Sequence, residues 1–132
     1  MKQAGFTLME SMITVLIVGI LMSIAIPSYN DYVIRSNRTE AMNGLLDMMR
    51  AQENYFANEF TYTTDLTHLN YNSVQDTYSG VYKITSETCG TDPLTECVKL
   101  IATPQGTQAN DGTMTLTSRG ERTHGTNTSW PK

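Results

Sequence analysis

One acidic residue, Glu10, lies within an otherwise uncharged apolar run that extends from Phe6 to Ile26. A charged side chain at the centre of a membrane-spanning helix costs about 2.5–3.5 kcal/mol on insertion scales, so such residues usually have a partner. The partner that fits best is a free α-amine at Phe6, which cleavage between Gly5 and Phe6 would create. Two helices staggered along an assembly axis would bring Glu10 of one subunit close to the Phe6 amine of the next. The pattern therefore predicts docking by charge pairing; the alternative is a carboxylate that snorkels to the interface or stays protonated.

The apolar run is long enough to cross a membrane. Its 21 residues, FTLMESMITVLIVGILMSIAI, would form a helix about 31 Å long. Lys2 precedes the run, and the positive-inside rule then keeps this end in the cytoplasm and sends the rest of the chain outside. An ordinary secretory signal has a longer charged start and a small-residue cleavage site behind the apolar part. We therefore expect a leader at residues 1–5, a transmembrane helix at 6–27 and an exported head at 28–132.

Composition limits what the head can be. The chain has 132 residues, which is room for one domain, and its net charge of −4 argues against a protein that coats nucleic acid non-specifically. Cys89 and Cys97 lie close together downstream of a membrane-targeting segment, which favours a disulfide formed outside the cytoplasm. Two free thiols in a cytosolic protein are the alternative. His68 has no second His or Cys at metal-ligand spacing, and we expect neither a metal nor a cofactor.

Periodicity places the remaining elements. Apolar residues spaced as in Ala41, Leu45, Met48 and Tyr55, with Gln52 as a polar exception, predict one helix from Phe6 to Asn58, bent near Pro27. Residues 58–72 are rich in Thr, Asn and Asp and predict a loop with one helical turn. Strands are expected at 80–87, 95–103 and 113–118, and residues 119–132 as a loop or frayed end. The expected fold class is α+β: a long N-terminal helix, its first half transmembrane, packed on a small antiparallel sheet of three to four strands.

The segment Gly5-Phe6-Thr7-Leu8-Met9-Glu10 resembles the processing site of type IV prepilins and of type II secretion pseudopilins. The resemblance implies that a prepilin peptidase cuts after Gly5 and methylates the new N-terminal Phe6, and that Glu10 supports docking into a helical filament. Gly19 and Pro27 also match family positions and bracket a stretch of helix that can loosen when the subunit enters a filament. Gly and Pro both weaken a helix interior, which agrees with that role.

The head resembles type IV minor pilins, a group that includes pilins recognising DNA during natural transformation. The matching segments are Tyr32–Ser36 (YVIRS), Arg38–Ala41 (RTEA), Gln52-Glu53 with Tyr55, Tyr62-Thr63 with Leu66 and Leu69, Ala102–Gly106 (ATPQG) with Gln108-Ala109 and Asp111, and Leu116-Thr117 with Gly120. Members of this group usually carry a further Cys pair, one after the Asp that corresponds to Asp111 and one near a C-terminal Trp. That pair is absent here, since Gly112 follows Asp111 and Ser129 precedes Trp130, so we expect a more mobile loop.

These patterns predict a structural subunit and not an enzyme: a minor pilin of the inner membrane that is built into an extracellular type IV pilus. Its implied partners are other pilins, the prepilin peptidase, the inner-membrane assembly machinery and, before assembly, lipid. A pseudopilin and a DNA-binding pilin are the alternatives, and DNA would be contacted by Lys99, Arg119, Arg122, His124 and Lys132, with Trp130 for base stacking. Arg35 and Arg38 would meet lipid phosphates or acidic residues of neighbouring subunits, or would form a solvated helix face.

Overall fold

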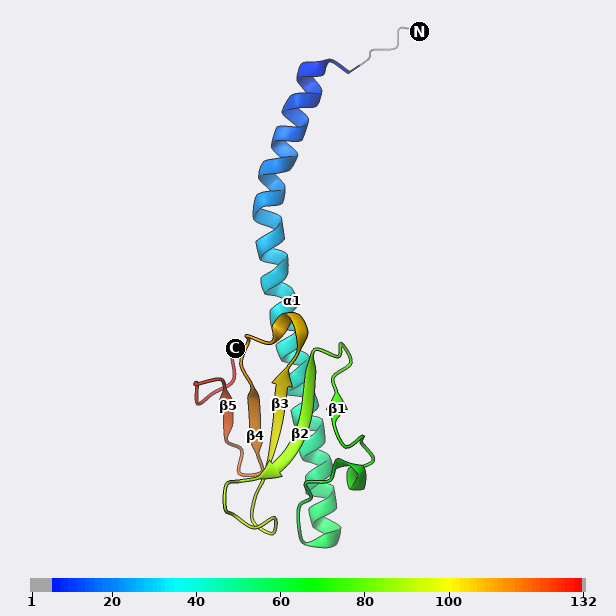
Figure 1. Ribbon diagram of the computed structural model, residues 1–132, viewed down its shortest axis with the longest axis vertical. Helices are drawn as coiled ribbons and strands as arrows, with labels where there is room; N and C mark the ends of the chain where they lie inside the picture. The colour runs from blue at the N-terminus through cyan, green and yellow to red at the C-terminus, as the bar shows by residue number, and fades with distance from the viewer. Residues whose placement is uncertain (1–5, 132) are drawn as a thin grey trace. The chain divides into compact units, whose positions relative to one another are not determined.

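The structure is a computed structural model that describes residues 6–131, so the expected leader, Gly5 and Lys132 lie outside the described residues. Helix α1 (Leu8–Glu59) is followed by a short 3-10 helix η1 (Leu66–Leu69), and the remaining chain forms a β-sheet (Figure 1). The chain separates into two compact units, residues 1–35 and residues 36–132. Each unit is described by itself.

The N-terminal unit is helical from Leu8 onward, and α1 continues without interruption through Pro27. All side chains from Phe6 to Tyr32 are exposed in the chain. The predicted helix, Phe6 to Asn58, is confirmed to within two residues at each end. The sequence forms one helix here because the apolar run contains one glycine, Gly19, and no proline, and its Leu, Met and Ala residues have high helix propensity.

In the second unit, one face of α1 packs on the sheet. The buried helix residues are Ala41, Leu45, Met48, Met49 and Gln52. They meet a sheet face that includes Tyr82, Ile84, Val98, Leu100, Met114 and Leu116, all in one apolar cluster. Gly44 lies at the closest approach, because a Cβ at this position would be 2.8 Å from Ile84 Cδ1.

The sheet has five strands in the order β1-β2-β3-β4-β5, and every neighbouring pair is antiparallel. The strands are β1 (Gln75–Asp76), β2 (Tyr82–Thr88), β3 (Val98–Pro104), β4 (Met114–Thr117) and β5 (Arg122–His124). The α+β fold class is confirmed, but the expected count of three to four strands was too low. The two edge strands have two and three residues and carry no alternating pattern of their own, so they depend on pairing with β2 and β4.

The C-terminal segment, residues 119–131, also differs from the prediction. It was expected as a loop or frayed end, but residues 122–124 pair with β4, and Trp130 packs against the core. The Trp130 indole Nε1 also donates a hydrogen bond of 3.0 Å to Thr115 O. A single large aromatic side chain at the end of a polar segment therefore ties that segment to the head.

Gln52, the polar exception in the apolar stripe, is fully buried. Its Nε2 donates to Thr63 O at 2.6 Å, and its Oε1 accepts from Thr63 N at 3.1 Å. Both ends of the amide are thus satisfied by one backbone position in the loop that leads to η1. A buried polar group costs stability unless it is hydrogen-bonded in this way, so Gln52 specifies the path of the loop.

Candidate functional site

The first turn of α1 contains the predicted docking residue, Glu10. Thr7 Oγ1 accepts a hydrogen bond of 3.3 Å from Glu10 N, and Thr14 Oγ1 donates to Glu10 O at 2.7 Å. Thr7 therefore satisfies one of the backbone donors that a helix start leaves unpaired. Within residues 6–131 the Glu10 carboxylate makes no ion pair, and Phe6 is 79% exposed. Among the described residues, the Glu10 side chain is exposed and has no cationic partner.

Helix α1 is, among the described residues, the one helix with the length and apolar composition needed to cross a membrane. None of its most apolar stretch is buried within the protein. The exposed large side chains include Leu16, Ile20 and Ile24. Exposed apolar surface of this extent is typical of a region that contacts lipid or another protein.

Gly19 and Pro27 are both in α1. A Cβ at Gly19 would meet no atom within 4 Å, so nothing in this chain requires a glycine there. Pro27 has no N–H to donate to the preceding turn, although the helix continues through it. The loosening of the helix between these residues stays a prediction.

The Cys89–Cys97 disulfide is present, with a Cα–Cα distance of 5.6 Å. It closes the connection between β2 and β3 beside the last strand pair, Thr88 and Val98. The enclosed loop also holds two other segments: Asp92 pairs with Arg119 at 2.8 Å, and Leu94 O accepts from Tyr62 N at 2.9 Å. The loop that the disulfide closes therefore contacts two other connections at this end of the sheet, one at Tyr62 and one at Arg119.

A buried charge cluster that the sequence did not reveal joins α1 to the segment around η2 (Gly106–Gln108). Arg38 Nε donates to both carboxylate oxygens of Asp111, at 2.9 and 2.8 Å, and Arg38 Nη2 donates to Oδ1 as well. Tyr82 OH donates to Asp111 Oδ2 at 2.7 Å, and Gln108 Nε2 donates to the same oxygen at 3.1 Å. The side chain of Asp111 is only 7% exposed. Arg38 was expected to face lipid, neighbouring subunits or solvent, but its guanidinium is bound within its own chain.

The cluster shifts the ionisation of its members. Burial alone would raise the pKa of Asp111, but hydrogen bonds from Arg38, Tyr82 and Gln108 outweigh it and hold that pKa well below its usual range. Burial, followed by the hydrogen bond to Asp111, raises the pKa of the Tyr82 phenol. At neutral pH Asp111 is therefore an ionised carboxylate that accepts from donors on α1, β2 and η2.

The segment that lacks the second Cys pair is held next to this cluster. Gly112 has a positive φ of 95°, and a Cβ there would lie 3.3 Å from Gly125 Cα. Gly125 N donates to Thr113 O at 2.9 Å, and the buried His124 Nε2 lies 3.6 Å from Asp111 Oδ2. The segment at Gly112 and Thr113 and the segment at His124 and Gly125 are thus connected by backbone contact and by the charge cluster. The expected higher mobility of this loop stays a prediction.

The candidate DNA-contact residues do not form one basic patch. Lys99 pairs with Glu87 at 3.3 Å, and Arg119 pairs with Asp92 at 2.8 Å. His124 is buried.

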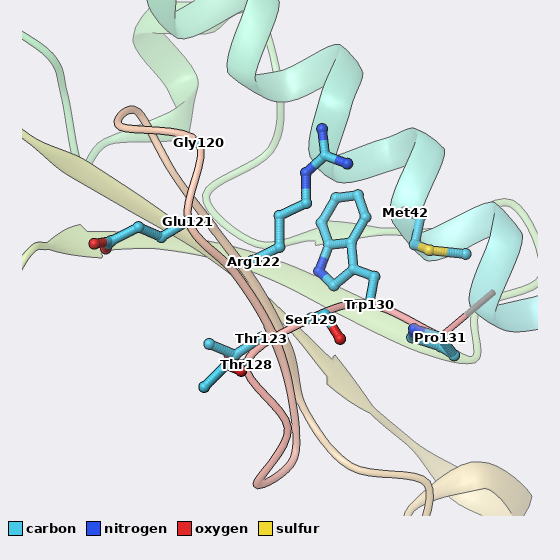
Figure 2. Close-up of a pocket in the computed structure, with 9 residues that line it drawn as sticks. All are labelled: Met42, Gly120, Glu121, Arg122, Thr123, Thr128, Ser129, Trp130 and Pro131. Carbon is cyan, nitrogen blue, oxygen red and sulfur yellow. The ribbon is translucent and has the colours of Figure 1, made fainter.

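Arg122 and Trp130 do lie together, beside an open cleft of about 720 Å³ (Figure 2). The Arg122 guanidinium carbon is 4.8 Å from the centroid of the Trp130 ring. This arrangement is a cation–π contact, so base stacking on that ring face requires Arg122 to move.

A long helix with an uncovered apolar half, followed by a helix-on-meander head stapled by one disulfide, defines the class of pilin-type subunits. Residues 27–117 match the family described as type IV minor pilin ComP, DNA uptake sequence receptor, and residues 1–26 match the prokaryotic N-terminal methylation motif. The chain belongs to this type IV minor pilin family.

Curated relatives agree with that assignment. The chain is 43% identical to fimbrial protein EcpC of Eikenella corrodens over 63 residues, which cover 48% of this chain and 41% of the relative. It is 56% identical to the type IV major fimbrial protein FimA of Dichelobacter nodosus over 41 residues, covering 31% and 26%. It is 40% identical to the type IV major pilin protein PilA of Myxococcus xanthus over 62 residues, covering 47% and 28%. The matches therefore span less than half the length of these relatives.

Proposed function

We propose that this minor pilin is a structural subunit that docks into a type IV pilus through its N-terminal helix. The observation that carries the proposal is the uncovered apolar half of α1 with one carboxylate, Glu10, that is unpaired within residues 6–131. Helices of this kind pack against one another in a filament core, where the buried charge of Glu10 needs a positive partner. The Phe6 α-amine of a neighbouring subunit, exposed by cleavage after Gly5, provides that charge.

The match to the N-terminal methylation motif supports processing by a prepilin peptidase and methylation of Phe6. Before assembly α1 crosses the inner membrane with its N-terminus in the cytoplasm and its head in the periplasm. The assembly machinery then transfers it to the extracellular pilus. The fimbrial names of the curated relatives support a pilus over a secretion pseudopilus.

The decisive experiment is intact-mass and N-terminal analysis of the membrane-associated protein, made with and without the host's prepilin peptidase. A mature chain that begins at Phe6 and carries one added methyl group only when the peptidase is present supports the proposal. A chain that begins at Met1 in both strains overturns it, because the docking amine is then never formed.

A DNA receptor is the second candidate, supported by the description of the family that matches residues 27–117. It ranks second because Lys99 and Arg119 pair with acidic neighbours, which leaves Arg122, beside Trp130, as the unpaired cation among the candidates within residues 6–131. The test is DNA binding by the detergent-solubilised full chain at low and high salt, compared with Arg122→Ala. Binding that weakens with salt and with the substitution supports the role, and no binding at low salt excludes it.

A further inference from the structure

We propose that Tyr29, Tyr32 and Arg35 form an interface collar that contacts the lipid headgroup layer and sets the depth at which α1 rests in the membrane before assembly. The inference rests on the proposed membrane insertion of α1. It assigns a partner, the lipid–water interface, to a part of the helix that lies beyond the apolar run. All three residues belong to the N-terminal unit, residues 1–35.

The position of the tyrosines along the helix matches the headgroup layer. The apolar run ends at Ile26, and the polar residues Ser28, Asn30 and Asp31 follow. At about 1.5 Å per residue, the Cα atoms of Tyr29 and Tyr32 lie about 4.5 and 9 Å beyond Ile26. The headgroup region adds roughly 5–7 Å to each side of the hydrocarbon core. Helix side chains tilt toward the N-terminus, so the Tyr32 ring reaches back into the same layer as Tyr29.

The exposure of the two rings needs an explanation. Tyr29 is 67% exposed and Tyr32 is 69% exposed, and neither phenol side chain makes a hydrogen bond or ring contact within residues 6–131. Residues three apart share one face of a helix, so both rings are presented on the same side. A phenol has an apolar body and a polar end, and tyrosine is enriched at membrane–water interfaces for that reason.

The Arg35 side chain points back along the helix toward the apolar run. Its Nε donates to Asp31 O at 3.3 Å, which folds the side chain back by one turn toward the apolar run. The guanidinium therefore lies near the level of Tyr32, where a long cationic side chain can reach the interface. Asp31 in the same turn offsets the charge of Arg35, so the collar does not require anionic lipid.

The test uses the full chain in lipid vesicles at a low protein-to-lipid ratio, with tryptophan as a depth reporter. Tyr29→Trp and Tyr32→Trp are compared with Leu16→Trp in the apolar run and with Tyr78→Trp, whose parent side chain is fully exposed in the head. Quenchers are a nitroxide on the headgroup and bromines at shallow and deep acyl positions. The emission of Trp130, measured in the unsubstituted chain, is subtracted from each variant.

The expected result is that the reporters at 29 and 32 lose most of their added emission to headgroup and shallow quenchers and little to deep bromines. This pattern should be the same in zwitterionic and anionic vesicles. If Leu16→Trp is quenched by deep bromines while the reporters at 29 and 32 behave like Tyr78→Trp, the collar is overturned but insertion stands. If Leu16→Trp is not quenched either, the proposed membrane insertion has failed. Protection at 29 and 32 only in anionic lipid, or only at a high protein-to-lipid ratio, also overturns the collar in favour of charge or helix–helix contact.

A second variant tests whether the collar sets the depth. In a Leu16→Trp chain, Tyr29→Ala combined with Tyr32→Ala should shift or broaden the depth profile of the reporter. Asn30→Ala, which changes a polar residue between the two rings, is the matched control and should leave the profile unchanged. An unchanged profile in the double variant would show that the rings do not fix the position of the helix.

Discussion

The guanidinium of Arg38 on α1 and the carboxylate of Asp111, 73 residues later, form an ion pair with both oxygens of the carboxylate engaged. The pair attaches the helix to the segment between β3 and β4, and Tyr82 and Gln108 complete the shell of the carboxylate. Removing one member of such a pair is costly, because the other charge then stays in the protein without its counter-charge.

Removing the arginine should therefore destabilise the head strongly. Arg38→Ala leaves the Asp111 carboxylate with the donors Tyr82 and Gln108 but without its cation. Because the Arg38 side chain is 26% exposed, we expect a loss of about 2–3 kcal/mol in the free energy of unfolding, below that of a fully buried pair. Chemical denaturation of the detergent-solubilised chain, followed by near-UV circular dichroism, measures the loss. Asp47→Ala, which breaks the exposed Asp47–Arg50 pair, is the control and should change stability by less than about 0.5 kcal/mol. Equal effects of the two variants would contradict a structural role for the Arg38–Asp111 pair.

Acid should destabilise the head through Asp111. The pKa of this carboxyl is lower in the folded chain than in the unfolded chain, so its contribution is fully present above the ordinary carboxyl pKa of about 4. The contribution declines as the pH falls below that value toward the depressed folded-state pKa. Unfolding midpoints measured between about pH 6 and pH 2 should therefore fall less steeply in Asp111→Asn than in the native chain. Parallel curves for the two proteins would assign the acid sensitivity to other carboxyl groups.

The disulfide should stabilise the head measurably. Removing the loop constraint with Cys89→Ser and Cys97→Ser together is expected to cost about 2.5 kcal/mol by the chain-entropy estimate. The comparison is thermal unfolding of the native chain with and without reductant. Reductant should lower the midpoint of the native chain and leave the double variant unchanged. A native midpoint that does not respond to complete reduction would show that the other contacts of the loop suffice.

Gly44 and Gly19 form a matched pair on α1. Gly44→Ala places a methyl group 2.8 Å from Ile84 Cδ1, so the end of this buried side chain must shift. Overpacking of this kind costs about 1–3 kcal/mol and the gain in helix propensity is about 1 kcal/mol, so we expect a net loss of up to about 2 kcal/mol. Gly19→Ala meets nothing within 4 Å and should leave the head's unfolding unchanged. Combining Gly44→Ala with Ile84→Val should recover part of the loss. If Gly44→Ala is as stable as the native chain, the close approach of helix and strand does not need a glycine.

Glu10→Ala should impair pilus assembly while membrane insertion stays intact, because removing the carboxylate abolishes the charge pair without making the apolar run more polar. The measurements are surface pili by electron microscopy and membrane fractionation, in a strain whose native copy is deleted. Ser11→Ala, the next exposed residue of the same turn, is the control and should assemble normally. Normal pili and motility with Glu10→Ala would argue strongly against the docking role.

The sequence by itself determined the features that depend on near neighbours in the chain. The apolar run, the position of Glu10 and the helical stripe from Ala41 to Tyr55 predicted α1 to within two residues. The three central strands were also placed to within three residues at each end, since each has enough residues to show its composition. The close spacing of Cys89 and Cys97 indicated their disulfide.

Only the tertiary structure decided the features that join distant segments. Strands β1 and β5 exist through backbone pairing with a neighbour, and two or three residues are too few to show a period. The commitment of Arg38 to Asp111, the neutralisation of Lys99 and Arg119, and the contact of Arg122 with Trp130 depend on which side chains the sheet brings together. Periodicity reports the face that a residue occupies, whereas the partner on that face is set by packing between elements that are far apart in the chain.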